Sequence, residues 1–181
     1  MLKVNKVTKD SEDLKTVKAL YENAFPKNER IDLNFIQANS ESDAESLEML
    51  AVYDGELFVG FVIVLNADDL SHILYFAVDE KLRSKGYGSQ ILQSVHNSRP
   101  GQRFVADVEK PNDNSDNNEQ REKRIRFYCR NGYKMTDAGY SWNGEDYVIL
   151  ACNGDVFQEE YMAFWKRYSD ILKKVANRKK L

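Results

Sequence analysis

A basic, glycine-containing loop is the part of this sequence best suited to binding a charged ligand. The loop runs from Arg83 to Ser89 and combines two cations with two glycines that stand one residue apart. Ile91, Leu92 and Val95 follow at helical spacing, so the loop leads into a helix N-terminus. Unpaired N–H groups and the helix dipole attract phosphate there, and glycine lets the backbone approach. The pattern favours a diphosphate ester as ligand, although an ordinary strand-to-helix turn has the same composition.

A strand must precede this loop and position it. Residues 73–78 form a continuous apolar run, ILYFAV, which is typical of a strand covered on both faces. Asp79 and Glu80 end the run. The loop is too short for a Walker P-loop and lacks the third glycine of the dinucleotide-binding fingerprint, so it fits neither of those phosphate sites.

Two segments resemble the GNAT superfamily of N-acetyltransferases. The sequence VDEKLRSKGYGSQIL resembles motif A, whose loop Arg/Gln-x-x-Gly-x-Gly/Ala is matched by Arg83, Gly86 and Gly88. IRFYCRNGYK, residues 125–134, resembles the family signature Phe-Tyr-x-x-x-Gly-Phe/Tyr. The resemblance covers residues 1–153 and implies an acetyltransferase-like domain of the mixed α/β (α+β) class. Its central, mainly antiparallel sheet is expected to be splayed between the fourth and fifth strands and flanked by helices.

The resemblance also implies acetyl-CoA as the cosubstrate and no metal. In the family, the loop amides hold the pyrophosphate, and the backbone of the preceding strand pairs with the pantetheine arm. The expected cofactor-binding residues are therefore Phe76, Ala77, Val78, Arg83, Ser84, Lys85, Gly86, Tyr87, Gly88 and Ser89.

One helix departs from the family pattern. Family members often read Asn-x-x-Ala-x-x-x-Tyr there, with the Asn contacting CoA, whereas this chain has Arg121 and Arg124 at those places. Two alternatives are open for these arginines. They meet a phosphate, or they pair with Glu119 and Glu122 on the helix surface.

Acetyl transfer to an amine requires a group that accepts a proton from the amine and a group that donates one to the departing thiolate. The resemblance implies Tyr128 as the acid, because it occupies the Tyr of the signature; a core tyrosine bonded to backbone is the alternative. His72 and Glu109 are the candidate bases. His72 lies where some family members carry Glu or His, and its unperturbed pKa of about 6.5 suits proton removal near neutrality. Glu109 ends the next expected strand. In the alternative interpretation, His72 and Glu109 have only structural roles.

The rest of the chain supplies the scaffold. We expect an edge strand over residues 2–8, a helix capped by Asp10 or Ser11 and stopped by Pro26, a short helix over 31–38 and a loop over 39–46. Asp54-Gly55 predicts a hairpin between strands 47–53 and 56–65. Further expected elements are a strand over 104–108, a polar loop over 110–118, a helix over 119–130 ended by Asn131-Gly132, and strands over 133–137 and 147–152.

The segment 154–181 is expected to form a C-terminal amphipathic helix that extends the same domain. Large apolar residues recur there at intervals of three and four: Tyr161, Phe164, Trp165, Tyr168, Ile171, Leu172 and Val175. This stripe must be buried, either on the protein's own sheet or helices or across a two-fold axis between two chains.

Composition limits the class of protein. The 181 residues, 42% of them apolar, suffice for one core, and a net charge of −3 gives no basic field for nucleic acid. We find no signal-peptide pattern and no apolar stretch of membrane-spanning length, so a soluble cytoplasmic protein with no membrane partner is expected. Cys129 and Cys152 have no metal-ligand spacing and are expected to be reduced and buried.

These observations predict an acetyl-CoA-dependent N-acetyltransferase acting on a primary amine of a small molecule or peptide. The alternative is a CoA-binding regulatory or interaction module of the same fold without turnover. Asp107, Glu109, Asp113 and Asp116 would favour a cationic amine if they line the acceptor mouth. A monomer and a homodimer are both compatible with the sequence.

Overall fold

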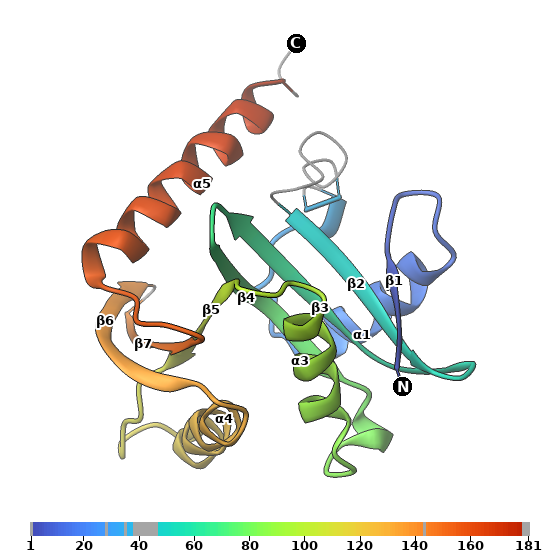
Figure 1. Cartoon of the computed structure of the whole chain (residues 1–181), viewed down its shortest axis with the longest axis horizontal. Helices are drawn as coiled ribbons and strands as arrows, with labels where there is room; N and C mark the ends of the chain where they lie inside the picture. The colour runs from blue at the N-terminus through green and yellow to red at the C-terminus, as the bar shows by residue number, and fades with distance from the viewer. Residues whose placement is uncertain (1, 28, 35, 38–46, 143, 179–181) are drawn as a thin grey trace. The chain divides into compact units, whose positions relative to one another are not determined.

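The computed structural model describes residues 2–27, 29–34, 36–37, 47–142 and 144–178, with side chains of the last helix described as far as Tyr168. The chain forms two compact units, Met1–Gln102 and Arg103–Leu181. Figure 1 shows their helices and strands.

The first unit is built on a four-stranded antiparallel sheet in the order β1-β2-β3-β4. Its strands are β1 (Lys3–Lys6), β2 (Leu47–Asp54), β3 (Leu57–Ala67) and β4 (Leu70–Val78). The predicted edge strand and the predicted hairpin are confirmed. Gly55 has φ +60° in the hairpin turn, a conformation that favours glycine.

Helix α1 (Asp13–Ala24) buries Val17 and Tyr21. Its predicted cap was wrong: Glu12 occupies the N-cap position and no side chain caps the helix, whereas Asp10 and Ser11 lie outside it. The predicted stop is confirmed, because the Phe25 N–H bonds the Tyr21 carbonyl and Pro26 follows. The predicted short helix lies partly outside the described residues, and the predicted loop over 39–46 lies entirely outside them.

Strand β4 leads through a short 3-10 turn, η1 (Glu80–Leu82), to helix α3 (Tyr87–Asn97), as the sequence predicts. The expectation that β4 is covered on both faces holds only in part. Ile73, Tyr75 and Ala77 are buried, but Phe76 and Val78 are partly exposed. Because alternate residues of a strand share a face, one face of the C-terminal half of β4 remains partly open.

The second unit contains an antiparallel sheet in the order β5-β7-β6, formed by β5 (Arg103–Glu109), β6 (Lys134–Trp142) and β7 (Glu145–Cys152). Helix α4 (Asn118–Arg130) ends at the predicted stop, where Gly132 has φ +89°. Strand β6 is longer than predicted because it continues through a register shift between Met135 and Gly139. The Thr136 hydroxyl donates to the Ile149 carbonyl at 3.0 Å within that shift.

Helix α5 (Gln158–Arg178) starts on the strands of its own unit (Figure 1). The Gln158 amide bonds both the N–H (2.8 Å) and the carbonyl (3.0 Å) of Gly139 in β6. Arg103 of β5 pairs with Glu160 and donates to the Asp155 carbonyl. The part of the predicted stripe that the structure describes is therefore docked in cis at its start, and its side chains Tyr161, Phe164 and Tyr168 are buried. Ile171, Leu172 and Val175 lie outside the described side chains.

Antiparallel strand pairing within each unit, together with the helices, confirms the predicted mixed α/β class. Cys152 is buried as predicted, but Cys129 is exposed, because it lies on the outer side of α4. No helix in the described part of the chain is long and apolar enough to cross a membrane.

Candidate functional site

The loop between β4 and α3 has the backbone geometry that the sequence predicted. Asp79 accepts a hydrogen bond from the Lys81 N–H at 2.9 Å and caps the short turn η1. Ser84 and Gly86 then adopt left-handed conformations, with φ of 62° and 86°. Gly86 is the N-cap residue of α3, and no side chain caps the helix there by a hydrogen bond. The first N–H groups of α3 are therefore available to an anion.

The charge around this loop suits a phosphate ester. Arg83, Ser84, Lys85, Gly86 and Ser89 are exposed. The Tyr87 hydroxyl donates to Asp54 at 2.8 Å, which ties the start of α3 to the β2–β3 hairpin. That hydrogen bond, more than burial, raises the pKa of Tyr87, so its hydroxyl remains a proton donor. The loop is thus fixed at its helix end, and its two cations are exposed to solvent.

Tyr128 of α4 is 6% exposed, and its ring lies against Phe127 and Tyr133, with centroids 5.3 and 5.1 Å away. Burial and, secondarily, the charge of Asp107 raise the pKa of Tyr128, while Arg124 lowers it. The hydroxyl is therefore protonated at neutral pH. The structural alternative requires a hydrogen bond from this hydroxyl to backbone, and it makes none to any residue that the structure describes.

Glu109, at the end of β5, is held by two guanidinium groups. Its carboxylate lies 3.6 Å from Arg121 and 3.6 Å from Arg124, and it accepts from the Asn117 amide at 3.3 Å. The residue is 8% exposed. These contacts tie the end of β5 to α4, so Glu109 anchors the helix on its own unit's sheet.

The predicted surface pairing of Arg121 with Glu119 or Glu122 is wrong. The side chain is buried and bonds Asn117 (2.8 Å), the Lys110 carbonyl (3.0 Å) and Glu145 (2.9 Å). The hydrogen bond that Arg121 donates to Glu145 is the main reason that the pKa of Arg121 is raised. Arg121 thus links the polar loop, α4 and the β6–β7 hairpin, and it is not positioned on the helix surface.

The surface partners of the neighbouring acids are other cations. Glu119 pairs with Lys123 at 2.7 Å and Glu122 with Arg126 at 3.0 Å, each one helical turn along α4. Arg124 points instead to Glu109. The spacing of the charged residues along α4 allowed Arg124 to pair with a glutamate of the same helix. The position of Glu109 at the end of β5 decided its partner instead.

His72 lies in the interior of the first unit. It stands opposite Leu65 in the β3–β4 ladder and has no exposed surface. The neighbouring Ser71 is equally buried and donates to Asn66 at 2.7 Å. A base must reach the amine whose proton it takes, so this burial favours the structural reading of His72.

The segment from Phe25 to Arg30, a Phe-Pro-x-x-Glu-Arg turn that also resembles family members, is fixed by tyrosines. The Tyr75 hydroxyl donates to the Glu29 carbonyl at 2.7 Å, and the Phe25 ring lies 5.0 Å from that of Tyr75. Tyr21 accepts from the Ile31 N–H at 2.9 Å. Glu29 and Ile31 are therefore tied by hydrogen bonds to β4 and α1 of their own unit.

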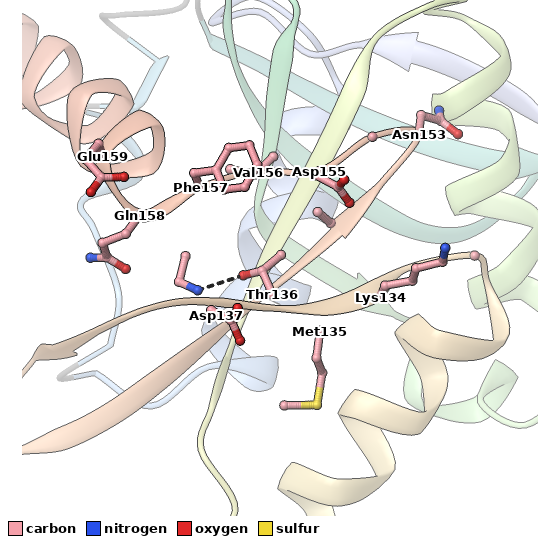
Figure 2. A pocket seen from close by; sticks show the side chains of 14 residues that line it. Lys134, Met135, Thr136, Asp137, Asn153, Asp155, Val156, Phe157, Gln158 and Glu159 are labelled. Carbon is pink, nitrogen blue, oxygen red and sulfur yellow. Dashed lines mark hydrogen bonds between the residues drawn. The ribbon is translucent and has the colours of Figure 1, made fainter.

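A separate cavity of about 600 Å³ lies in the second unit. It is bounded by the start of β6, the end of β7 and segment 153–159. Figure 2 shows Thr136 pointing from β6 toward the stretch that carries Asp155, Val156 and Phe157. None of the residues expected to bind the cofactor or to catalyse lines this cavity.

In the part of the chain that the structure describes, no group of three His, Cys, Asp or Glu side chains is arranged to hold a metal ion.

The sequence comparison identifies the family. Residues 45–135, half of the chain, match the family profile described as an acetyltransferase (GNAT) domain. The chain therefore belongs to the GNAT acetyltransferase family. No curated protein sequence matches it significantly.

Solved structures share the fold. A protein from Bacteroides thetaiotaomicron assigned to the GNAT family is 23% identical, with a TM-score of 0.71 over 96% of this chain and 95% of that chain. A GNAT acetyltransferase from Elizabethkingia anophelis with acetyl-CoA bound is 16% identical, with a TM-score of 0.55 over 83% and 97%. The ribosomal-protein-S18-alanine N-acetyltransferase from Escherichia coli is 17% identical, with a TM-score of 0.59 over 84% and 93%. These similarities confirm the predicted GNAT-like fold.

Proposed function

We propose that this chain is an acetyl-CoA-dependent N-acetyltransferase that acetylates a primary amine of a small molecule or peptide. The observation that carries the proposal is the β4–loop–α3 unit, in which Gly86 opens the helix N-terminus and Arg83 and Lys85 stand exposed beside it. Family membership supports acyl transfer, and two structural neighbours carry acetyl-CoA or N-acetylate a ribosomal protein.

The residues of the loop fit a CoA pyrophosphate. Backbone N–H groups from Gly86 to Ser89 would bind its oxygens, and Arg83 and Lys85 would balance its charge. Ser84 already has the left-handed backbone that lets successive N–H groups converge. The backbone of Phe76, Ala77 and Val78 is the proposed site for the pantetheine arm. Acetyl-CoA supplies the activated acyl group.

Tyr128 is the proposed acid. Its hydroxyl is buried, keeps its proton at neutral pH and has no hydrogen-bond partner among the described residues, so it is available to a departing thiolate. The raised pKa makes complete proton transfer unfavourable before the carbon–sulfur bond breaks. Tyr128 is therefore expected to donate a hydrogen bond first and its proton as charge develops on sulfur.

The cofactor site is tested with a matched pair of glycine variants. Gly86 and Gly101 have nearly the same left-handed φ, 86° and 82°, so valine strains both backbones alike, but only Gly86 lies in the loop. In calorimetry, we expect Gly86→Val to weaken acetyl-CoA binding by at least about 100-fold, because the anion site is lost. Gly101→Val should lower the stability of the protein alone. Gly88→Val should behave like Gly86→Val, and Arg83→Ala and Lys85→Ala should weaken binding by less.

Turnover is tested with a panel of polyamines, amino acids, aminoglycosides and peptide N-termini. Acetyl transfer to one of these amines supports the enzyme. Tight acetyl-CoA binding without transfer to any of them identifies the non-catalytic CoA-binding module instead. Unchanged acetyl-CoA affinity in a folded Gly86→Val protein contradicts the loop assignment itself.

A further inference from the structure

One arginine of the first unit, Arg30, is partly buried without a charged partner. The other two arginines of that unit are Arg83 and Arg99. Arg83 is exposed in the glycine-containing loop, whereas Arg99, which is partly exposed like Arg30, pairs with Glu48 and bonds the Val95 carbonyl. Arg30 forms no hydrogen bond or ion pair with any residue that the structure describes, and its Nε atom is buried.

A guanidinium in this position destabilises the fold. A cation that is partly withdrawn from water without a new hydrogen bond loses hydration and gains nothing in return. Arg99 offsets that loss by its ion pair, and Arg30 does not. The Arg30 guanidinium is therefore available to an anion from outside the chain, and no internal bond has to break before it binds one.

The backbone on both sides of Arg30 is fixed. The Tyr75 hydroxyl donates to the Glu29 carbonyl at 2.7 Å. The Ile31 N–H donates to the Tyr21 hydroxyl at 2.9 Å, and that hydroxyl donates to the Ile31 carbonyl at 3.0 Å. The rings of Tyr21 and Tyr75 meet edge to face, with centroids 4.9 Å apart. Neighbours held in this way preorganise a binding side chain and lower the entropy cost of binding.

Tyr75 also links Arg30 to the strand proposed to bind the cofactor. It directly precedes residues 76–78 of β4, whose backbone is the proposed site of the pantetheine arm. Its hydroxyl bonds the residue before Arg30, and all of these groups belong to the first unit. An acceptor that presents its amine to a thioester on β4 can therefore reach Arg30 with its other end.

We propose that Arg30 binds a carboxylate of the acceptor, so that the acetylated amine belongs to an amino acid or a related amino carboxylate. A guanidinium donates two parallel N–H bonds to a carboxylate and repels a second cation. The carboxylate of Asp32 in the same segment already accepts from the Asn34 N–H at 2.9 Å. This inference rests on the N-acetyltransferase activity proposed above and names the class of its acceptor.

The kinetic test compares ω-amino acids of two to six carbons with their primary amides, which have the same chain length and lack the carboxylate charge. We expect kcat/KM of the best amino acid to exceed that of its amide by about 10- to 100-fold in the wild type. Arg30→Met should abolish this preference, and Arg30→Lys should keep part of it as a point charge. Lys27→Met removes a charge at an exposed position of the same turn and should keep all of it.

A second measurement does not depend on turnover. The Nε–H signal of Arg30 is assigned in an NMR spectrum by its loss in Arg30→Met, and butyrate or butyramide is then added to the wild type. Butyrate should shift the signal and butyramide should not. The urea midpoint of Arg30→Met should not fall, because no internal bond is lost. A lower midpoint, with equal losses for amino acids and amides, indicates a structural role and overturns the inference.

The outcomes also separate the inference from the proposed function. A wild type that acetylates amines without preferring the carboxylate, or a Lys27→Met protein that loses the preference as Arg30→Met does, overturns the role of Arg30 and leaves the enzyme intact. A wild type that acetylates no amine overturns the proposed function and the acceptor class, while a butyrate-dependent shift still supports the anion site. An Arg30 signal that butyrate does not move overturns the site itself.

Discussion

Replacing Arg121 by methionine is expected to destabilise the protein strongly, although the residue lies on a helix rich in surface charge. The Arg121 side chain is 4% exposed, and it bonds Asn117, the Lys110 carbonyl and Glu145 while lying 3.6 Å from Glu109. Methionine fills a similar volume but leaves the Glu109 carboxylate, 10% exposed, with less compensating charge.

The magnitude follows from the exposure of the partners. Breaking a buried ion pair by removing one member costs about 3 to 5 kcal/mol. Glu145 is 41% exposed and can be solvated again, and Arg124 remains near Glu109. The lower end of that range, about 3 kcal/mol, is therefore expected. With a urea m-value of about 2 kcal/mol/M, the unfolding midpoint should fall by about 1.5 M.

Arg126→Met is the matched control. Arg126 lies on the same helix and also pairs with a glutamate, Glu122 at 3.0 Å, but the two side chains are 54% and 44% exposed. An exposed pair of this kind contributes about 0.3 to 0.5 kcal/mol, so the midpoint should move by about 0.2 M. Equal shifts in the two variants, or a loss below about 1 kcal/mol in Arg121→Met, would refute the reasoning from burial.

Two further predictions follow. Tyr128→Phe should lower kcat by about 10²-fold and leave acetyl-CoA affinity nearly unchanged. The loss is at the low end for a general acid because the pKa of Tyr128 is raised. Stopped-flow kinetics measure kcat and calorimetry measures the affinity, and an unchanged kcat removes Tyr128 from the mechanism. Burial is the main cause that raises the pKa of six tyrosines in the described part of the chain, so the unfolded chain releases protons first above about pH 10, and stability should fall there by up to about 1.4 kcal/mol per pH unit for each. Urea unfolding between pH 8 and 11.5 tests this, and constant stability to pH 11 contradicts it. The six are Tyr21, Tyr53, Tyr128, Tyr133, Tyr140 and Tyr161.

Local signals explain why much of the fold was predictable. Asp54-Gly55 demands a left-handed turn, and Gly55 adopts it. Asn131-Gly132 ends α4 for the same reason, and the loop from Arg83 to Ser89 opens α3 as expected. Each of these features depends on the conformational freedom of one glycine beside a periodic apolar pattern, and both can be read from neighbouring residues.

The helix cap and the length of β6 were harder to predict. Asp10 and Ser11 both have side chains that cap helices, but α1 begins two residues later without a side-chain cap. Strand β6 passes through a register shift at Thr136, whose hydroxyl bonds β7. Such boundaries depend on the partner strand or helix more than on local propensity.

The sequence by itself determined the family, the order of the elements and the glycine-containing loop that opens α3, because these depend on short motifs and on the spacing of apolar residues. Only the tertiary structure decided which charges meet. Arg121, Arg124 and Glu109 are up to 15 residues apart in the chain, yet they form one ion-pair network, and Tyr140 reaches Asp107 across 33 residues. A side chain's partner, and hence its protonation and its role, is set by the distance between strands and helices that pack together, which spacing along the chain does not encode.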